Sequence, residues 1–259
     1  MKKVTVRVYG RLNDFLPPGR RQAAFAHAFE GRESVKDLVE GLGVPHPEVD
    51  LILVNGEPVA FDYVVRDGDR IAVFPRFECI DVGDVTLVRS PLEVLRFVLD
   101  GHLGKLARYM RLIGLDAECR VDASDDDIAE LAARNGRIVL TRDRGLLKRR
   151  AVSHGYWMRA TAPRQQLVEV LHRFGPTLVP FTRCLCCNTE LREVPKSAVV
   201  SQLEPRTRKY YQRFHECPGC HRIYWSGSHW QRLTRLVEKT RLEAETHVER
   251  ARFLDSRER

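Results

Sequence analysis

The fold is decided by the run Val94-Leu95-Arg96-Phe97-Val98-Leu99, which stops at Asp100-Gly101, and by a second run, Ile138-Val139-Leu140-Thr141, which stops at Arg142-Asp143. Near-continuous apolar runs are typical of strands that are covered on both faces of a parallel sheet. Ligands of an open α/β sheet gather at the carboxyl ends of its strands, so an aspartate just past the end of each run indicates a metal-dependent hydrolytic site.

Helical patterns and a further strand separate the two runs. The residues after Gly101 predict a helix that Gly114 closes, because Leu103, Leu106, Met110 and Ile113 recur at helical spacing. A strand at 115–121 follows, then a helix that starts at Ser124. Alternating strands and helices predict an α/β domain over residues 84–175.

The acidic triplet Asp125-Asp126-Asp127 has two interpretations. Ser124 and Asp127 form a capping box, and acids in a first turn complement the helix dipole. Alternatively, one of the three joins Asp100 and Asp143 in a metal site, although Asp143 also suits a helix cap. Carboxylates this close repel one another unless a divalent cation neutralises them, and an oxygen-only set suits Mg²⁺ or Mn²⁺.

Charge is spread unevenly along the chain. Residues 1–83 carry 11 Lys/Arg and 13 Asp/Glu, a net of −2, whereas residues 84–259 carry 32 and 22, a net of +10. A basic surface around an acidic pocket suits a polyanion, although a solvated charged surface explains the excess equally well. The cations nearest the aspartates form a stripe in the first helix and flank the second aspartate; they are Lys105, Arg108, Arg111, Arg142, Arg144, Lys148, Arg149 and Arg150.

Five of the seven cysteines lie in two groups, Cys184-Leu185-Cys186-Cys187 and Cys217-Pro218-Gly219-Cys220. Two Cys-x-x-Cys pairs with 29 residues between them predict a structural Zn²⁺ site with four thiolate ligands. Cys186 can replace either neighbour, and His215 or His221 is a further alternate. Disulfides are the competing interpretation.

The segments on either side of this central region have their own patterns. Residues 1–83 read strand, strand, helix, strand, strand, with a turn at Asn55-Gly56, which predicts an α+β domain of the β-grasp type. The basic and aromatic segment 205–215 suits either single-stranded RNA binding or a ribbon hairpin with its aromatic side packed down. From about Trp230 the sequence predicts a helical tail.

The motifs Phe97–Arg108, Leu112–Asp116 and Gly136–Asp143 resemble the Mut-seven C-terminal ribonuclease domain family, a branch of the PIN-like nuclease fold. Members join a ubiquitin-like β-grasp domain, similar to small sulfur carriers, to this domain and a zinc ribbon. The resemblance implies domains at 1–83, 84–175 and 176–259, and metal-dependent RNA cleavage. It places the catalytic metal ligands at Asp100, Asp125 and Asp143, with Asp126 or Asp127 as alternatives to Asp125.

The expectation is therefore a Mg²⁺- or Mn²⁺-dependent ribonuclease with a structural zinc ion at Cys184, Cys187, Cys217 and Cys220. Lys105, Arg108, Arg142 and Arg144 would contact the RNA backbone. A non-catalytic RNA-binding or ribosome-associated module is the alternative function. The β-grasp domain lacks the terminal Gly-Gly of a sulfur carrier and suits docking of a protein partner. No run approaches the roughly 18 apolar residues of a membrane helix, so a cytoplasmic location is expected.

Overall fold

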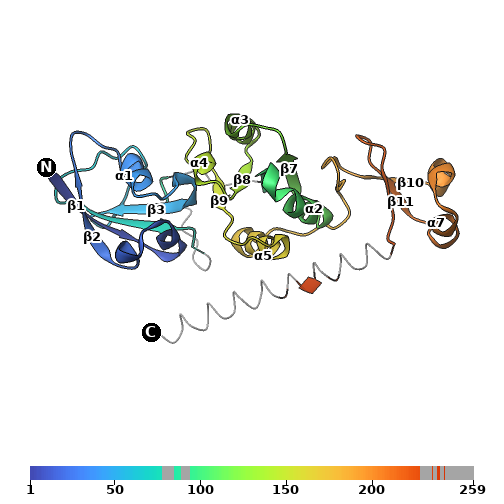
Figure 1. Cartoon of the computed structure of the whole chain (residues 1–259), viewed down its shortest axis with the longest axis horizontal. Coiled ribbons are helices and arrows are strands. Elements are labelled where there is room, and N and C mark those ends of the chain that lie inside the picture. The colour runs from blue at the N-terminus through green and yellow to red at the C-terminus, as the bar shows by residue number, and fades with distance from the viewer. Residues whose placement is uncertain (78–84, 89–93, 228–234, 236–237, 240–241, 243–259) are drawn as a thin grey trace. The chain divides into compact units, whose positions relative to one another are not determined.

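The computed structural model describes residues 1–77, 85–88, 94–227, 235, 238–239 and 242 (Figure 1). The chain forms two compact units, one of residues 1–94 and 125–157 and one of residues 95–124 and 158–259. Each unit therefore joins segments that are distant in sequence. This division does not test the domain boundaries at residues 83 and 175, which stay predictions.

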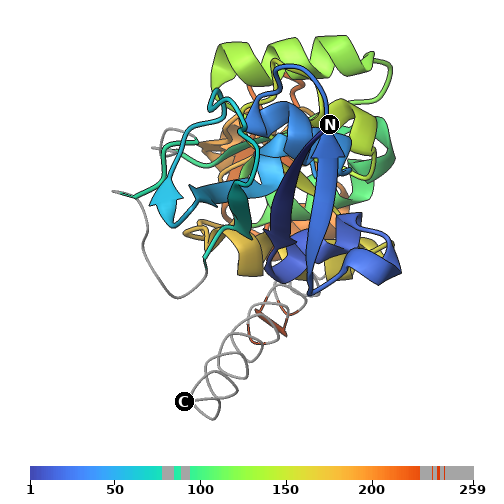
Figure 2. The same cartoon turned by 90° about the vertical axis from the view of Figure 1, so that its left-hand side faces the viewer.

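The first unit begins with a five-stranded sheet of order β2-β1-β5-β3-β4, in which β1 and β5 are parallel and the other pairs antiparallel (Figure 2). This arrangement, with helix α1 after the second strand, is the predicted β-grasp. The elements are β1 (Lys2–Val8), η1 (Gly10–Phe15), η2 (Pro18–Arg20), β2 (Ala24–Phe29), α1 (Val35–Gly41), η3 (His46–Glu48), β3 (Val49–Val54), β4 (Glu57–Pro58) and β5 (Arg70–Pro75).

Local sequence explains this sheet. Val4, Val6 and Val8 alternate with exposed residues, and the apolar face they form packs on the buried side of α1. Ser34 caps α1, since its Oγ accepts the Asp37 backbone N–H at 3.1 Å. Strand β4 is only two residues long, Glu57–Pro58, and lies at the edge of the sheet, where a proline that cannot donate to the ladder is tolerated.

The remainder of the first unit consists of α3 (Asp125–Asn135), β8 (Ile138–Thr141), α4 (Arg144–Leu147) and β9 (Gly155–Trp157). Strands β8 and β9 are parallel, and every residue of β8 is buried, as the apolar run predicts. Polar contacts join this segment to the β-grasp: His46 Nε2 lies 2.7 Å from the Val152 carbonyl oxygen, and the Trp157 N–H donates to Glu48.

The second unit contains a parallel strand pair, β6 (Arg96–Asp100) and β7 (Asp116–Arg120), connected by η4 (Gly101–Leu103) and α2 (Gly104–Leu112). The four predicted apolar positions of this connection are buried: Leu103, Leu106, Met110 and Ile113. Helix α5 (Pro163–Phe174) packs against α2, with proline at its first position and Gly175 in the left-handed conformation at its end.

A three-stranded antiparallel ribbon, of order β10-β11-β12, completes the described part of the second unit. Its elements are β10 (Arg192–Val194), α6 (Lys196–Val199), η5 (Val200–Gln202), α7 (Pro205–Tyr210), β11 (Phe214–Glu216) and β12 (Ile223–Tyr224). Segment 205–215, expected to be either an RNA-binding stretch or a hairpin, thus starts as a helix and enters a strand at buried Phe214.

The predicted helical tail falls mostly outside the described residues. The four residues of it that are described, at 235, 238, 239 and 242, are helical. Within the described part of the chain, every helix is too short or too polar to cross a bilayer.

Candidate functional site

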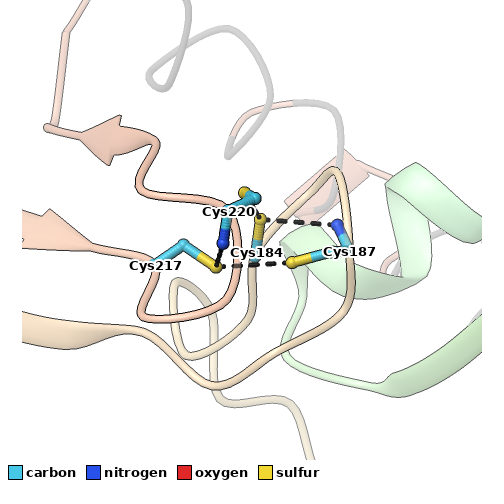
Figure 3. A group of neighbouring side chains, drawn as sticks. All are labelled: Cys184, Cys187, Cys217 and Cys220. Carbon is cyan, nitrogen blue, oxygen red and sulfur yellow. Dashed lines mark hydrogen bonds between the residues drawn. The ribbon is translucent and has the colours of Figure 1, made fainter.

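The four cysteines of the two Cys-x-x-Cys pairs come together in the second unit (Figure 3). The Sγ atoms of Cys184, Cys187, Cys217 and Cys220 lie within 4.8 Å of one another. A tetrahedral zinc ion with Zn–S bonds of about 2.3 Å needs sulfurs about 3.8 Å apart. Two of the pairs are at 3.3 and 3.5 Å. The cluster can therefore hold one zinc ion, and Cys186, which is exposed, lies outside it.

The knuckle turns already favour thiolates at some positions. Backbone N–H groups of Cys186 and Cys187 donate to Cys184 Sγ, and that of Cys220 donates to Cys217 Sγ. Burial opposes ionisation of Cys187, but hydrogen bonds with Thr189 and the neighbouring thiols outweigh it and lower its pKa to about 6. Burial raises the pKa of Cys220 to about 12. Zinc would displace the protons that the cluster retains.

Arg111 joins the first knuckle to helix α2. Its Nε donates to the Ala117 carbonyl at 2.7 Å, and its Nη1 donates to the carbonyls of Leu185 and Cys186 at 3.2 and 2.8 Å. The residue is only 6% exposed, so the expected place of Arg111 in a basic surface stripe is wrong. Burial lowers its pKa, whereas the nearby thiols raise it, because a positive charge offsets thiolate charge.

A signal for this role was present in the sequence. Arg111 lies four residues after Ala107, so both residues fall on the flank of the apolar face of α2. A second anchor, Asn188, follows the knuckle directly. Its side chain donates to Asp116 at 2.7 Å and accepts the Ala117 N–H at 3.1 Å. A left-handed φ of 68° at Asn188 permits this turn.

Asp100 ends β6, as predicted, and is half-buried. Its Oδ1 accepts the His102 N–H at 2.9 Å, which caps η4. The turn also requires Gly101, because a Cβ there would lie 2.8 Å from the Val121 carbonyl oxygen. The carboxylate is therefore held in one orientation by the backbone that follows it.

Asp125 and Asp143 belong to the first unit. Asp143 caps α4 by accepting the Gly145 N–H at 2.6 Å, as its sequence position suggested. Asp125 is the half-buried first residue of α3, whereas Asp126 is largely exposed and forms an ion pair with Arg149 at 3.1 Å. The ion pair gives Asp126 a partner other than a metal.

The four cations expected to contact RNA are all exposed. Lys105 and Arg108 lie on α2, and Arg142 precedes the Asp143 cap. The guanidinium of Arg144 stacks on Trp157, 4.3 Å from a ring centroid, and lies 5.1 Å from that of Phe15. These cation–π contacts orient Arg144, a constraint that the charge pattern did not reveal.

Comparisons with known proteins give matches over most of the chain. The family described as the Mut7-C RNAse domain matches residues 95–237, more than half of the chain, and that described as Mut7-C ubiquitin matches residues 1–81. Among solved structures, the chain is similar to the crystal structure of H. volcanii small archaeal modifier protein 1, with 21% identity over 30% of this chain and 100% of that chain and a TM-score of 0.24. No curated protein matches the chain.

Proposed function

Because the chain belongs to the Mut7-C RNAse domain family, we propose that it is a metal-dependent ribonuclease that hydrolyses RNA phosphodiester bonds. The observation that carries the proposal is the family match over residues 95–237, which spans all three candidate aspartates. By analogy with related nucleases, the products would carry a 5′-phosphate and a 3′-hydroxyl.

The proposed ligands of a catalytic Mg²⁺ or Mn²⁺ are Asp100, Asp125 and Asp143. Their chemistry fits, since hard divalent cations prefer carboxylate oxygens. Asp100 and Asp143 each accept a backbone N–H through Oδ1, so their orientation is set before a metal binds. A cation bound there would neutralise the scissile phosphate and activate the attacking water.

The surrounding cations would position the substrate. Lys105 and Arg108 project from α2, which begins four residues after Asp100, and Arg142 and Arg144 flank Asp143. Contacts of this kind hold the sugar–phosphate backbone without reading bases. The stacked guanidinium of Arg144 would lose less freedom on binding a phosphate than an unrestrained side chain would.

The four-cysteine cluster and the β-grasp domain would have supporting roles. Zinc at the four-cysteine cluster would be structural, because a closed set of four thiolates leaves no open coordination position. The β-grasp domain continues into the chain after β5, so we propose that it docks a protein partner and does no chemistry.

Cleavage of labelled oligonucleotides tests the proposal. The intact protein should cut RNA with Mg²⁺ or Mn²⁺ and not with a chelator. Asp100→Asn and Asp143→Asn keep the oxygen that accepts the capping N–H, and they should lower the rate by about a hundredfold or more. Asp126→Asn is the matched control for Asp125→Asn, and only the latter should lose activity.

The outcomes separate the two candidate functions. If Asp100→Asn and Asp143→Asn cut as fast as the wild-type chain, the ligand assignment is wrong. If the intact protein cuts RNA with neither metal yet binds it tightly, the protein is a non-catalytic RNA-binding module, the function that the basic excess of residues 84–259 also fits.

A further inference from the structure

A groove of about 1130 Å³ lies within the second unit, between α2 and β7 on one wall and α7 and β12 on the other. The first zinc knuckle contributes Leu185 and Cys186 to its lining. Four arginines line the groove, and its described lining includes no aspartate or glutamate. Because the whole chain carries 35 acidic residues, a wall of this size without one favours an anionic ligand.

Three of the arginines are available to a ligand. Arg108 lies on α2, Arg206 on α7 and Arg222 just before β12, and all three are exposed. The fourth, Arg111, already donates hydrogen bonds to the backbone carbonyls of Ala117 and of Cys186 in the first knuckle. Positive charge therefore reaches the groove from both walls, which suits a chain of phosphates better than a single anion.

Aromatic side chains lie among these cations. Tyr211 and Trp225 pack against the small ribbon core of Val199, Leu203 and Phe214, and both also line the groove. The core holds these rings in place before any ligand arrives. Tyr210 also lines the groove and is 68% exposed. Rings of this kind among arginines are suited to stacking with nucleic-acid bases.

The groove reaches the strand end that carries Asp100. Cys119 lines it, and the Cys119 Sγ lies 3.6 Å from the Asp100 carbonyl oxygen. Val121 also lines it and is in close contact with Gly101, the residue after Asp100. A polymer that lay in the groove would therefore pass beside the carboxyl end of β6.

We propose that this groove binds a single-stranded segment of RNA. Bases stack on Tyr210, Tyr211 and Trp225, and phosphates contact the exposed arginines of both walls. Paired bases are not available for such stacking, so duplex RNA binds more weakly. That the bound strand is the one cut rests on the proposed ribonuclease function, whereas binding itself does not.

The test measures binding of a fluorescent single-stranded RNA oligonucleotide to the full chain. The buffer contains no Mg²⁺ or Mn²⁺, so that binding through the groove is measured without cleavage. Tyr210→Ala should weaken binding at least about fivefold, the effect of losing one base stack. Arg206→Ala and Arg222→Ala should each weaken binding and reduce its salt dependence. Arg192→Ala removes one charge from an exposed ribbon residue outside the groove and should bind as the wild type does.

Duplex RNA and single-stranded DNA of the same sequence form the other arms, and zinc content and circular dichroism check that each variant is folded. The proposed binding role of the groove is refuted if the wild-type chain does not bind single-stranded RNA or binds duplex RNA more tightly. It is also refuted if folded groove variants bind single-stranded RNA as tightly as Arg192→Ala does. Cleavage is measured separately with Mn²⁺. If the wild-type chain cuts RNA and the groove variants bind RNA normally, only the proposed RNA-binding role of the groove is overturned. If binding depends on the groove residues but the wild-type chain does not cut RNA, only the proposed ribonuclease function is overturned.

Discussion

Replacing Arg111 by methionine should detach the first zinc knuckle from α2. The guanidinium serves three carbonyls, and their surroundings differ. Ala117 is fully buried, so loss of its donor should cost about 1.5–3 kcal/mol. Leu185 is half-buried and Cys186 exposed, so their carbonyls regain water and each loss should cost about 0.5–1 kcal/mol. The total is about 2.5–5 kcal/mol, before the loss of the charge that offsets the thiolates.

The assay is the urea concentration at which zinc is released to a chromogenic chelator. It reports the knuckle directly, which matters because a chain with two units need not unfold in one step. Arg111→Met should release zinc at a clearly lower urea concentration than the wild type does. Arg111→Lys should fall between the two, because it keeps the charge and loses the fork of donors.

Arg108→Met is the matched control, since Arg108 lies one turn earlier on the same helix and is exposed. It should change stability by less than about 0.5 kcal/mol. Equal zinc release by Arg111→Met and Arg108→Met would show that the buried guanidinium and its three hydrogen bonds do not hold the knuckle.

Two further predictions concern the zinc cluster and the turn after β6. Cys217→Ser should lose stoichiometric zinc and the ribbon structure, as judged by elemental analysis and near-ultraviolet circular dichroism. Cys186→Ser should keep one zinc ion per chain. Loss of zinc from Cys186→Ser would mean that the wrong thiol has been assigned as a ligand. Gly101→Ala should destabilise the chain by about 1–3 kcal/mol in thermal unfolding, because the new methyl group meets the Val121 backbone. Gly41→Ala, whose Cβ meets nothing within 4 Å, is the control, and equal melting temperatures for the two variants would contradict the close approach.

Features that depend on neighbours in sequence were predictable. The spacing of Leu103, Leu106 and Met110 predicted the buried face of the connection after β6, and all three are buried. The order of strands and turns predicted the β-grasp, including the turn at Asn55-Gly56, where both residues have positive φ. Two Cys-x-x-Cys pairs predicted a four-cysteine cluster, because each pair forms its own knuckle and only the meeting of two knuckles is long-range.

The candidate aspartates were predictable in position but not in surroundings. Their places after strands and at a helix start follow from the apolar runs, and the cap that the position of Asp143 suggested is present. The structure adds the cap at Asp100. The ion pair of Asp126 with Arg149 joins residues 23 positions apart, which a local pattern cannot show. Their joint role as metal ligands stays a proposal.

What the sequence by itself determined is therefore the set of local elements, the four cysteines of the cluster and the position of each aspartate, because periodicity, capping and Cys-x-x-Cys spacing act over a few residues. The tertiary structure decided what the cations do. One buried arginine, Arg111, donates hydrogen bonds to the backbone of the first cysteine knuckle, Arg144 stacks on Trp157, and Arg108 lines a groove with Arg206. These arginines have the same charge, and only the burial and partners that the fold brings to each of them separate a structural role from a binding one.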